Sequence, residues 1–286
     1  MSATSQVEVP MARRRSGRER VIGRGLTYLA ATLLALFILV PIYLIAVSAF
    51  TPRENAFDFP RSVIPTAVSI DTITFFLNAG GVIDAFWRSV FVALITLGLS
   101  LLIGAPAGYA IARYVFRGRS AYRLAVLSTR AFPIVILAIP LAVTYRLWGI
   151  DDTVIGVALM HTALALPFTV LITSSVFVSV PRELEEAAQT LGCNPVQAFL
   201  RVSLPLALPG LAAAAIFTWV LSWNDVFAAV ILTLRNPTLP AKILTALTQS
   251  PIYYQFAAGF VMLVPSLIVI FFIRRYLLGL WGRVVK

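Results

Sequence analysis

Residues 89–112 read SVFVALITLGLSLLIGAPAGYAIA, a run that contains no Asp, Glu, Lys or Arg. A helix of more than 20 apolar residues rises by about 30 Å or more and can cross the hydrocarbon core of a bilayer. Similar runs recur along the chain of 286 residues, of which 59% are hydrophobic and 12% charged. Soluble domains are roughly a quarter charged. The composition therefore excludes a water-soluble domain and predicts an all-α, polytopic membrane bundle.

Charge-poor runs predict six transmembrane helices. The runs are Leu26–Phe50, Ser89–Ala112, Leu124–Tyr145, Thr153–Val180, Leu206–Leu234 and Phe256–Ile273. The first could instead be a cleaved leader, but its apolar run is longer than that of an ordinary leader. We expect residues 1–24 to form a basic tail, residues 25–280 one six-span domain, and residues 281–286 a short C-terminal tail.

The net charge of +11 results from 23 Lys and Arg against 12 Asp and Glu. Most of the cations fall on one side of the six predicted spans, in the N-terminal tail, in 113–123, in 182–201 and after residue 273. The positive-inside rule therefore predicts that both termini are cytoplasmic. The charge is an orientation signal, and we expect no nucleic-acid partner.

Prolines and small residues inside the predicted spans indicate bent, closely packed helices. Proline removes a helix hydrogen bond and favours a kink. Small residues, as in Gly104–Gly108 and Gly210–Ala215, permit close approach of neighbouring helices. The prolines within spans are at positions 41, 106, 133, 140, 167, 209 and 265.

The loop between the fourth and fifth spans, residues 181–205, has the pattern of a short amphipathic helix. Pro181 suits the first position of a helix, and Gly192 can end it. Negative charge in the first turns complements the helix dipole; the acids there are Glu183, Glu185 and Glu186. An apolar stripe follows helical spacing; its members are Leu184, Ala187, Ala188 and Leu191.

A second short helix should follow, because Asn194-Pro195 supplies a cap and a helix start. We expect it to run to Leu204-Pro205. The first helix could lie on the membrane surface or dock in a groove of a soluble partner. Its acidic character favours docking, since helices that lie on membranes are usually basic and aromatic.

A spaced signature in this loop resembles a known family. It consists of Glu186-Ala187-Ala188, three residues, Gly192, nine residues and Val202-Ser203-Leu204-Pro205. The pattern resembles the EAA signature of permease subunits of bacterial binding-protein-dependent ABC importers, in which Ile usually occupies the position of Val202. The likeness continues through Leu166–Phe168, Ser222–Asp225 and Gly279–Lys286. Over residues 25–286 the chain is most similar to the six-span partner of the maltose-type carbohydrate permease pair.

This resemblance implies a type I ABC importer permease fold in the bacterial inner membrane. It implies a heterodimer with a second permease, two ATPase subunits and an extracytoplasmic substrate-binding protein. ATP and Mg²⁺ would be bound by the ATPases, with no cofactor and no catalytic residue in this chain. The predicted coupling residues are Glu183, Leu184, Glu186, Ala187, Ala188, Leu191, Gly192 and Pro205. In the tail, Gly282 and Lys286 would also reach toward the ATPases.

Polar residues within spans are candidates for contact with the cargo. Arg130 lies in the third predicted span, where a charge usually faces protein or water. It could line the pathway, or it could snorkel to the interface. Trp223, Asn224 and Asp225 combine an aromatic face with hydrogen-bonding groups that suit a hydroxyl-rich solute. Trp219 and Trp223 could equally be interfacial anchors.

Other classes of function find little support in the sequence. A chain with one histidine, His161, and one cysteine, Cys193, cannot form a disulfide framework or a multi-His metal site. We expect His161 to be a packed, hydrogen-bonded side chain. A proton-coupled carrier would need intramembrane acids, and Asp225 is the only one in the predicted spans. Neither Lys242 nor Lys286 follows a glycine, so a phosphate-binding loop is excluded. A disaccharide or oligosaccharide is the expected cargo, with glycerol phosphate or a polyol as the alternative.

Overall fold

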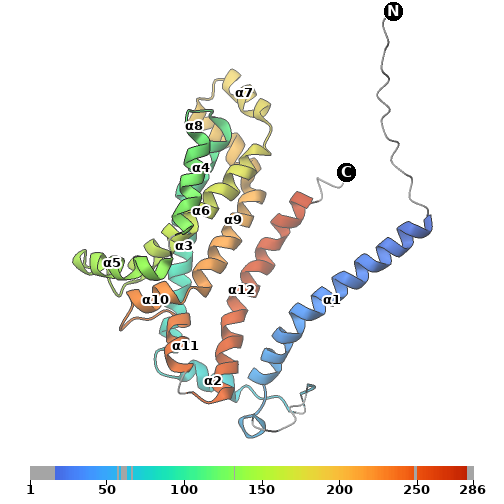
Figure 1. Cartoon of the computed structure of the whole chain (residues 1–286), viewed down its shortest axis with the longest axis vertical. Helices are drawn as coiled ribbons and strands as arrows, with labels where there is room; N and C mark the ends of the chain where they lie inside the picture. Colours follow the sequence, from blue (N-terminus) through green and yellow to red (C-terminus); the bar gives the residue numbers. More distant parts are fainter. Residues whose placement is uncertain are drawn as a thin grey trace, which may run out of the picture.

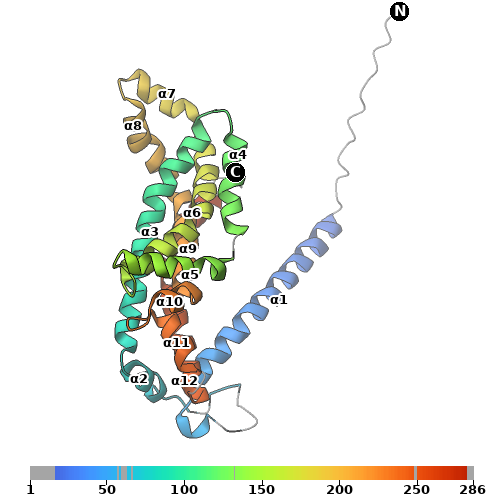
Figure 2. The same cartoon turned by 60° about the vertical axis from the view of Figure 1, so that its left-hand side comes forward.

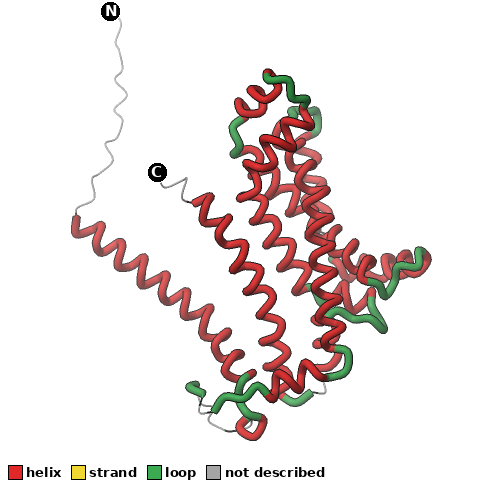
Figure 3. The backbone as a smooth tube through the Cα atoms, turned by 180° about the vertical axis from the view of Figure 1, so that it is seen from behind, coloured by secondary structure: helices red, strands yellow, loops and turns green. Residues whose placement is uncertain are grey.

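The computed structural model describes residues 17–56, 58, 63–65, 67–131, 133–247 and 250–281. Every regular element within these ranges is a helix, which confirms the all-α class (Figure 3). The long helices are α1 (Gly17–Ala49), α3 (Val82–Arg113), α6 (Val154–Val178), α9 (Leu204–Asn224) and α12 (Ile252–Trp281). The shorter helices are α2 (Asp71–Asn78), α4 (Arg119–Ser128), α5 (Ile134–Leu147), α7 (Arg182–Thr190), α8 (Pro195–Ala198), α10 (Phe227–Leu232) and α11 (Leu239–Leu247).

Helices α3, α6 and α9 pack together as the centre of the bundle, and α12 lies against α9 (Figure 1). Helix α1 meets α12 near the end of the molecule that carries α2 and diverges from it toward the other end (Figures 1 and 2). Helices α7 and α8 lie beyond one end of the central helices, while α2 and α11 lie at the opposite end. The long helices therefore separate α7 from α2 by the full length of the bundle.

Close contact between α3 and α6 depends on glycine. A methyl group added at Gly104 would lie 2.7 Å from Cγ2 of Thr169, and one added at Gly108 would lie 2.7 Å from the backbone nitrogen of Ser174. The hydroxyl of Thr173 donates a 2.8 Å hydrogen bond to the carbonyl oxygen of Gly104. The expected close approach at small residues is thus confirmed, and polar contacts cross the same interface.

The third predicted span is bent by 90°. Among the described residues, five helices are long and apolar enough to cross a membrane, and a sixth span is obtained when Arg119–Ala131 and Ile136–Leu147 are taken as one broken span. Pro133 lies at this break in an extended conformation and has no N–H to continue a helix. Apolar composition predicted that Leu124–Tyr145 belongs in the membrane, but it carries no information on the direction of the chain after Pro133.

The predicted end of the fifth span is wrong. The fifth span ends at Asn224 and does not continue to Leu234, because Asp225 is extended and its Oδ1 accepts a 2.9 Å hydrogen bond from the N–H of Ala228 at the start of α10. The first candidate membrane span, Gly23–Ala49, agrees with the predicted one, and α1 extends before it to Gly17 because the apolar span nucleates a helix that continues into the preceding residues.

Candidate functional site

The C-terminus of α7 is closed by Gly192, as the sequence predicted. Gly192 has a φ of +96°, in the left-handed region that glycine adopts without a Cβ penalty. Its N–H donates to the carbonyl of Gln189 at 3.0 Å, and the N–H of Cys193 donates to Ala188 at 3.0 Å. This pair of bonds is a Schellman motif, which satisfies the last carbonyls of the helix and turns the chain sharply.

The second predicted helix begins at its expected cap. Asn194 and Gln197 form a capping box, in which each side chain accepts a hydrogen bond from the other residue's backbone N–H. The expected end at Pro205 is wrong, because the helix continues into α9 through a π-helical turn, Phe199–Ser203. Pro205 lacks an N–H, and this wider turn carries the helix to it without a break.

The apolar stripe of α7 is uncovered in the described structure. Leu184 is 44% exposed and Leu191 is 88% exposed, while Ala187 is exposed and Ala188 half-buried between them. The acids Glu183 and Glu186 are also exposed. Because α7 lies beyond the ends of the central helices (Figure 1), these side chains form a surface that a partner outside the spans can reach.

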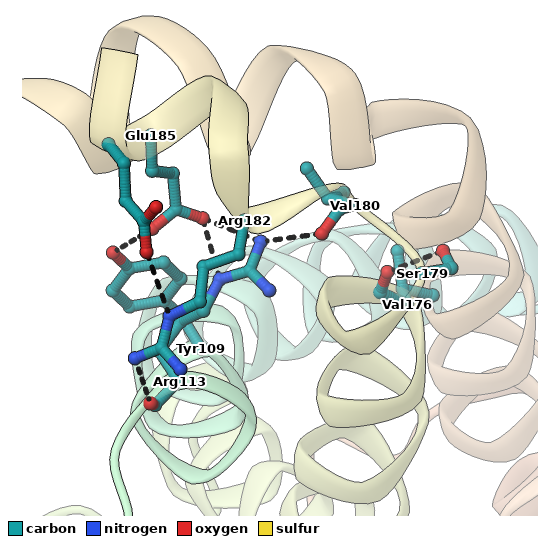
Figure 4. Close-up of polar contacts among 8 residues, drawn as sticks. Tyr109, Arg113, Val176, Ser179, Val180, Arg182 and Glu185 are labelled. Atoms are coloured by element: carbon teal, nitrogen blue, oxygen red, sulfur yellow. Dashed lines mark hydrogen bonds and ion pairs between the residues drawn. The ribbon is translucent and has the colours of Figure 1, made fainter. Parts of the chain in front are cut away.

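The opposite side of α7 is held by a buried ion pair (Figure 4). Arg113, the last residue of α3, places its guanidinium 2.6 Å from Oε1 of Glu185. The Tyr109 hydroxyl donates a 2.8 Å hydrogen bond to Oε2 of the same carboxylate. Burial alone would raise the pKa of Glu185, but the nearby hydroxyls of Ser203 and Tyr109 and the hydrogen bond and charge of Arg113 outweigh it and keep the pKa below its usual range. Glu185 is therefore a carboxylate in this structure.

Further hydrogen bonds converge on Arg113. Its Nη2 atom donates to the carbonyl oxygen of Val180, just beyond the end of α6, at 2.9 Å. Its own carbonyl oxygen accepts a 3.0 Å hydrogen bond from Arg182 of α7. The sequence suggested only a helix-dipole role for Glu185, because its spacing on α7 does not reveal a partner 72 positions away.

Trp223 is a core residue in this structure, and its predicted contact with the cargo stays a prediction. The side chain is fully buried, and its Nε1 donates a 2.9 Å hydrogen bond to the carbonyl of Met262 on α12. Its ring stacks on that of Trp219, which is also buried, with 5.8 Å between the ring centroids. Residues of α12 pack against both rings.

Asn224 and Asp225 have different environments. Asn224 is exposed, and its side-chain amide donates to the carbonyl of Val220 at 2.9 Å. Asp225 lies 3.3 Å from Nε2 of His161, whose Nδ1 is 2.9 Å from the hydroxyl of Ser222. His161 is 1% exposed, which confirms the expected packed, hydrogen-bonded imidazole and engages Asp225 within the bundle.

Arg130 faces an aromatic ring on the wall of a cavity. Its guanidinium carbon lies 4.4 Å from the ring centroid of Phe168, a cation–π geometry. A cavity of about 450 Å³ between α3, α4, α5 and α6 is lined by Arg130, Tyr122 and Met160 among others. The role of Arg130 in the pathway stays a prediction. Gly282 and Lys286 lie outside the described residues.

An acid between α5 and α6, Asp152, accepts several hydrogen bonds from another loop. Oδ1 of Asp152 accepts backbone N–H bonds from Leu234, Arg235 and Asn236 at 2.9, 3.1 and 2.9 Å. Burial would raise the pKa of Asp152, but these donors and the side-chain amide of Asn236 hold it below its usual value. The contact fixes the α10–α11 loop to the start of α6.

The fold defines a polytopic membrane protein, and one of its helices, α7, presents an exposed apolar stripe outside the long helices. A family model described as "Binding-protein-dependent transport system inner membrane component" matches residues 100–278. The chain belongs to this family, and the resemblance seen in its EAA signature is confirmed.

Curated relatives extend over nearly the whole chain. The trehalose transport system permease protein SugB of Mycobacterium tuberculosis (strain CDC 1551 / Oshkosh) is 33% identical over 272 residues, which cover 92% of this chain and 98% of that protein. The diacetylchitobiose uptake system permease protein NgcG of Streptomyces coelicolor is 30% identical over 251 residues, which cover 86% and 83%.

Solved structures show the same fold. One chain comes from the crystal structure of a bacterial ABC transporter involved in the import of the acidic polysaccharide alginate. It superposes with a TM-score of 0.71 at 21% identity and covers 93% of this chain and 100% of that chain. The type I importer permease fold that the resemblance implied is thereby supported over the length of the bundle.

Proposed function

We propose that this chain is the carbohydrate-translocating permease subunit of an ABC importer and that it lies in the bacterial inner membrane with both termini in the cytoplasm. It pairs with a second permease to enclose the pathway, and an extracytoplasmic binding protein delivers the cargo. Relatives named for trehalose and diacetylchitobiose transport support a di- or oligosaccharide. The distribution of Lys and Arg supports the orientation.

Helix α7 is the proposed link to two ATPase subunits, which bind ATP and Mg²⁺. The observation that carries this proposal is the exposed apolar stripe of Leu184, Ala187 and Leu191 on a helix beyond the spans. Such a stripe fits the helix-in-groove mode of docking. ATP-driven closure of the ATPases would move α7 and tilt the spans between inward-open and outward-open states.

Co-purification of the complex tests this docking surface. Leu191→Asp places a charge on the most exposed leucine of the apolar stripe, so we expect the ATPase subunits to be lost from the purified complex. Leu234→Asp is the matched control, because Leu234 is 90% exposed in the loop between α10 and α11, which lies away from α7 (Figure 1). If the Leu191 variant retains its ATPases as the Leu234 variant does, α7 is not the docking helix.

The cargo is tested separately. The binding protein that assembles with this complex is titrated with trehalose, diacetylchitobiose, longer oligosaccharides and glycerol phosphate. We expect a sugar to bind and to stimulate ATP hydrolysis by the reconstituted complex. Stimulation by glycerol phosphate alone would contradict the proposed carbohydrate cargo.

A further inference from the structure

Helix α7 has two faces with different tasks. The apolar stripe points outward, whereas Arg182, Glu185 and Gln189 line a polar cavity of about 230 Å³ together with Tyr109 and Arg113 of α3. These inner positions follow helical spacing, and they lie on the flank of α7 that the stripe leaves free. The inner face thus contacts the membrane bundle itself.

Each oxygen of the Glu185 carboxylate has a partner on α3. Oε1 faces the Arg113 guanidinium at 2.6 Å and Oε2 accepts from the Tyr109 hydroxyl at 2.8 Å. Both members of the ion pair are buried, with side-chain exposures of 8% for Arg113 and 5% for Glu185. Removing one partner of a buried pair leaves an uncompensated charge, so this contact holds α7 in one orientation.

The aromatic ring of Tyr109 is fixed as well. It lies 5.4 Å from the ring of Phe177 on α6 and 4.6 Å from the ring of Phe199 in the π-helical turn. Packing of the ring therefore fixes the position of the hydroxyl that donates to Glu185. Through Arg113 and Tyr109, one cluster joins α3, the end of α6, α7 and the start of the helix that continues into α9 (Figure 4).

The covalent connections of α7 are poorly suited to transmit a movement by themselves. One connection is the short Ser179–Pro181 segment, and the other passes through Gly192 in its left-handed conformation. Backbone at such positions can absorb rotation, as hinge residues do. A helix held only by these two ends could pivot without displacing the spans.

We propose that Arg113 and Glu185 are positioning residues that make α7 and α3 move as one body, so that a displacement of α7 by the ATPases reaches the translocation pathway. This inference rests on the proposed function of α7. Without the ion pair, ATP is still hydrolysed, but α7 pivots at its two ends and the spans are not displaced.

The test measures transport per ATP hydrolysed by the full complex in liposomes. Glu185→Gln and Arg113→Gln should each retain the ATPase subunits and lower this ratio at least about fivefold. The double variant should be no worse than the poorer single variant, because either change alone already breaks the same contact. Arg117→Gln is the matched control, since Arg117 is exposed in the neighbouring loop.

Milder variants keep the inference falsifiable if the glutamine variants fold poorly. Tyr109→Phe removes one hydrogen bond and keeps the ring, and Arg113→Lys keeps the charge; both should lower the ratio by a smaller factor. A wild-type ratio in both variants would overturn the inference, and so would additive losses in the double variant or loss of the ATPases from it. Loss of docking in Leu191→Asp with an unchanged ratio in Glu185→Gln would refute only this inference and leave the proposed function intact.

Discussion

Nδ1 of His161 and the hydroxyl oxygen of Ser222 lie 2.9 Å apart and join α6 to α9 inside the bundle. The same imidazole has its Nε2 atom 3.3 Å from Asp225, and Ser222 donates a 3.4 Å bond to Thr96 of α3. A single histidine thus participates in a polar cluster that connects three central helices and the break after α9.

Replacing His161 should destabilise this cluster. In His161→Phe the ring volume is largely kept, but Ser222 and Asp225 lose their partner, at a cost of about 1–3 kcal/mol. Ser222→Ala should cost less, because it removes one hydroxyl only. The measurement is chemical unfolding of the purified chain in detergent. Additive effects in the double variant would contradict coupling between the two side chains.

Gly108→Ala should disrupt the α3–α6 interface. The added methyl group would overlap the Thr173 side chain and lie 2.7 Å from the backbone nitrogen of Ser174, so we expect a loss of about 1–3 kcal/mol from overpacking. Gly98→Ala on the same helix is the matched control, since its methyl group would meet none of the described atoms within 4 Å. Thermal unfolding should show a lowered midpoint for Gly108→Ala alone; equal shifts would refute the packing explanation.

The effect of a substitution at Gly192 should depend on how well the new residue tolerates a positive φ. An added side chain has open space there, but φ is +96°, a region costly for β-branched residues and tolerated by Asn. We expect Gly192→Val to impair cargo-stimulated ATP hydrolysis strongly, with local strain of about 1–3 kcal/mol, and Gly192→Asn to retain more activity. Equal loss in the two variants would indicate that side-chain contact with the partner, rather than the turn, matters.

Asp152 should make the α10–α11 loop sensitive to acid. Its pKa is lowered in the folded state from an ordinary value of 3.8, so its stabilising contribution is present above about that pH. That contribution is lost as the pH falls through the lower folded-state value. The difference in unfolding midpoint between wild type and Asp152→Ala should therefore shrink as the medium is acidified below pH about 4.

Asp151→Ala is the matched control for this experiment, because Asp151 is an exposed neighbour in the same loop. It should show no comparable pH-dependent difference. If the difference in unfolding midpoint between wild type and Asp152→Ala stayed constant across the acid range, the ionised form of the Asp152 carboxylate would not be what stabilises the loop.

Local chemistry explains which features were predictable. Apolar runs identified the membrane helices because the bilayer selects on composition over about 20 residues. Gly192 and Asn194 identified the ends of the loop helices because a cap depends on atoms within one turn. The EAA spacing identified the family through the same short-range order, and the stripe that it contains is exposed at Leu184 and Leu191.

Features that involve distant parts of the chain were not predictable. Trp223 has the composition of a sugar-binding or interfacial residue, yet α12 encloses it. Arg113 resembled one more cytoplasmic cation, yet it neutralises Glu185 in a buried pair.

By itself the sequence determined the membrane environment, the helical class and the stripe of α7, because each follows from neighbours within a few turns. Only the tertiary structure decided the 90° bend at Pro133, the enclosure of Trp223 and the pairing of Arg113 with Glu185. These depend on which helices pack together, and side chains 72 positions apart acquire their partners only when that packing is complete.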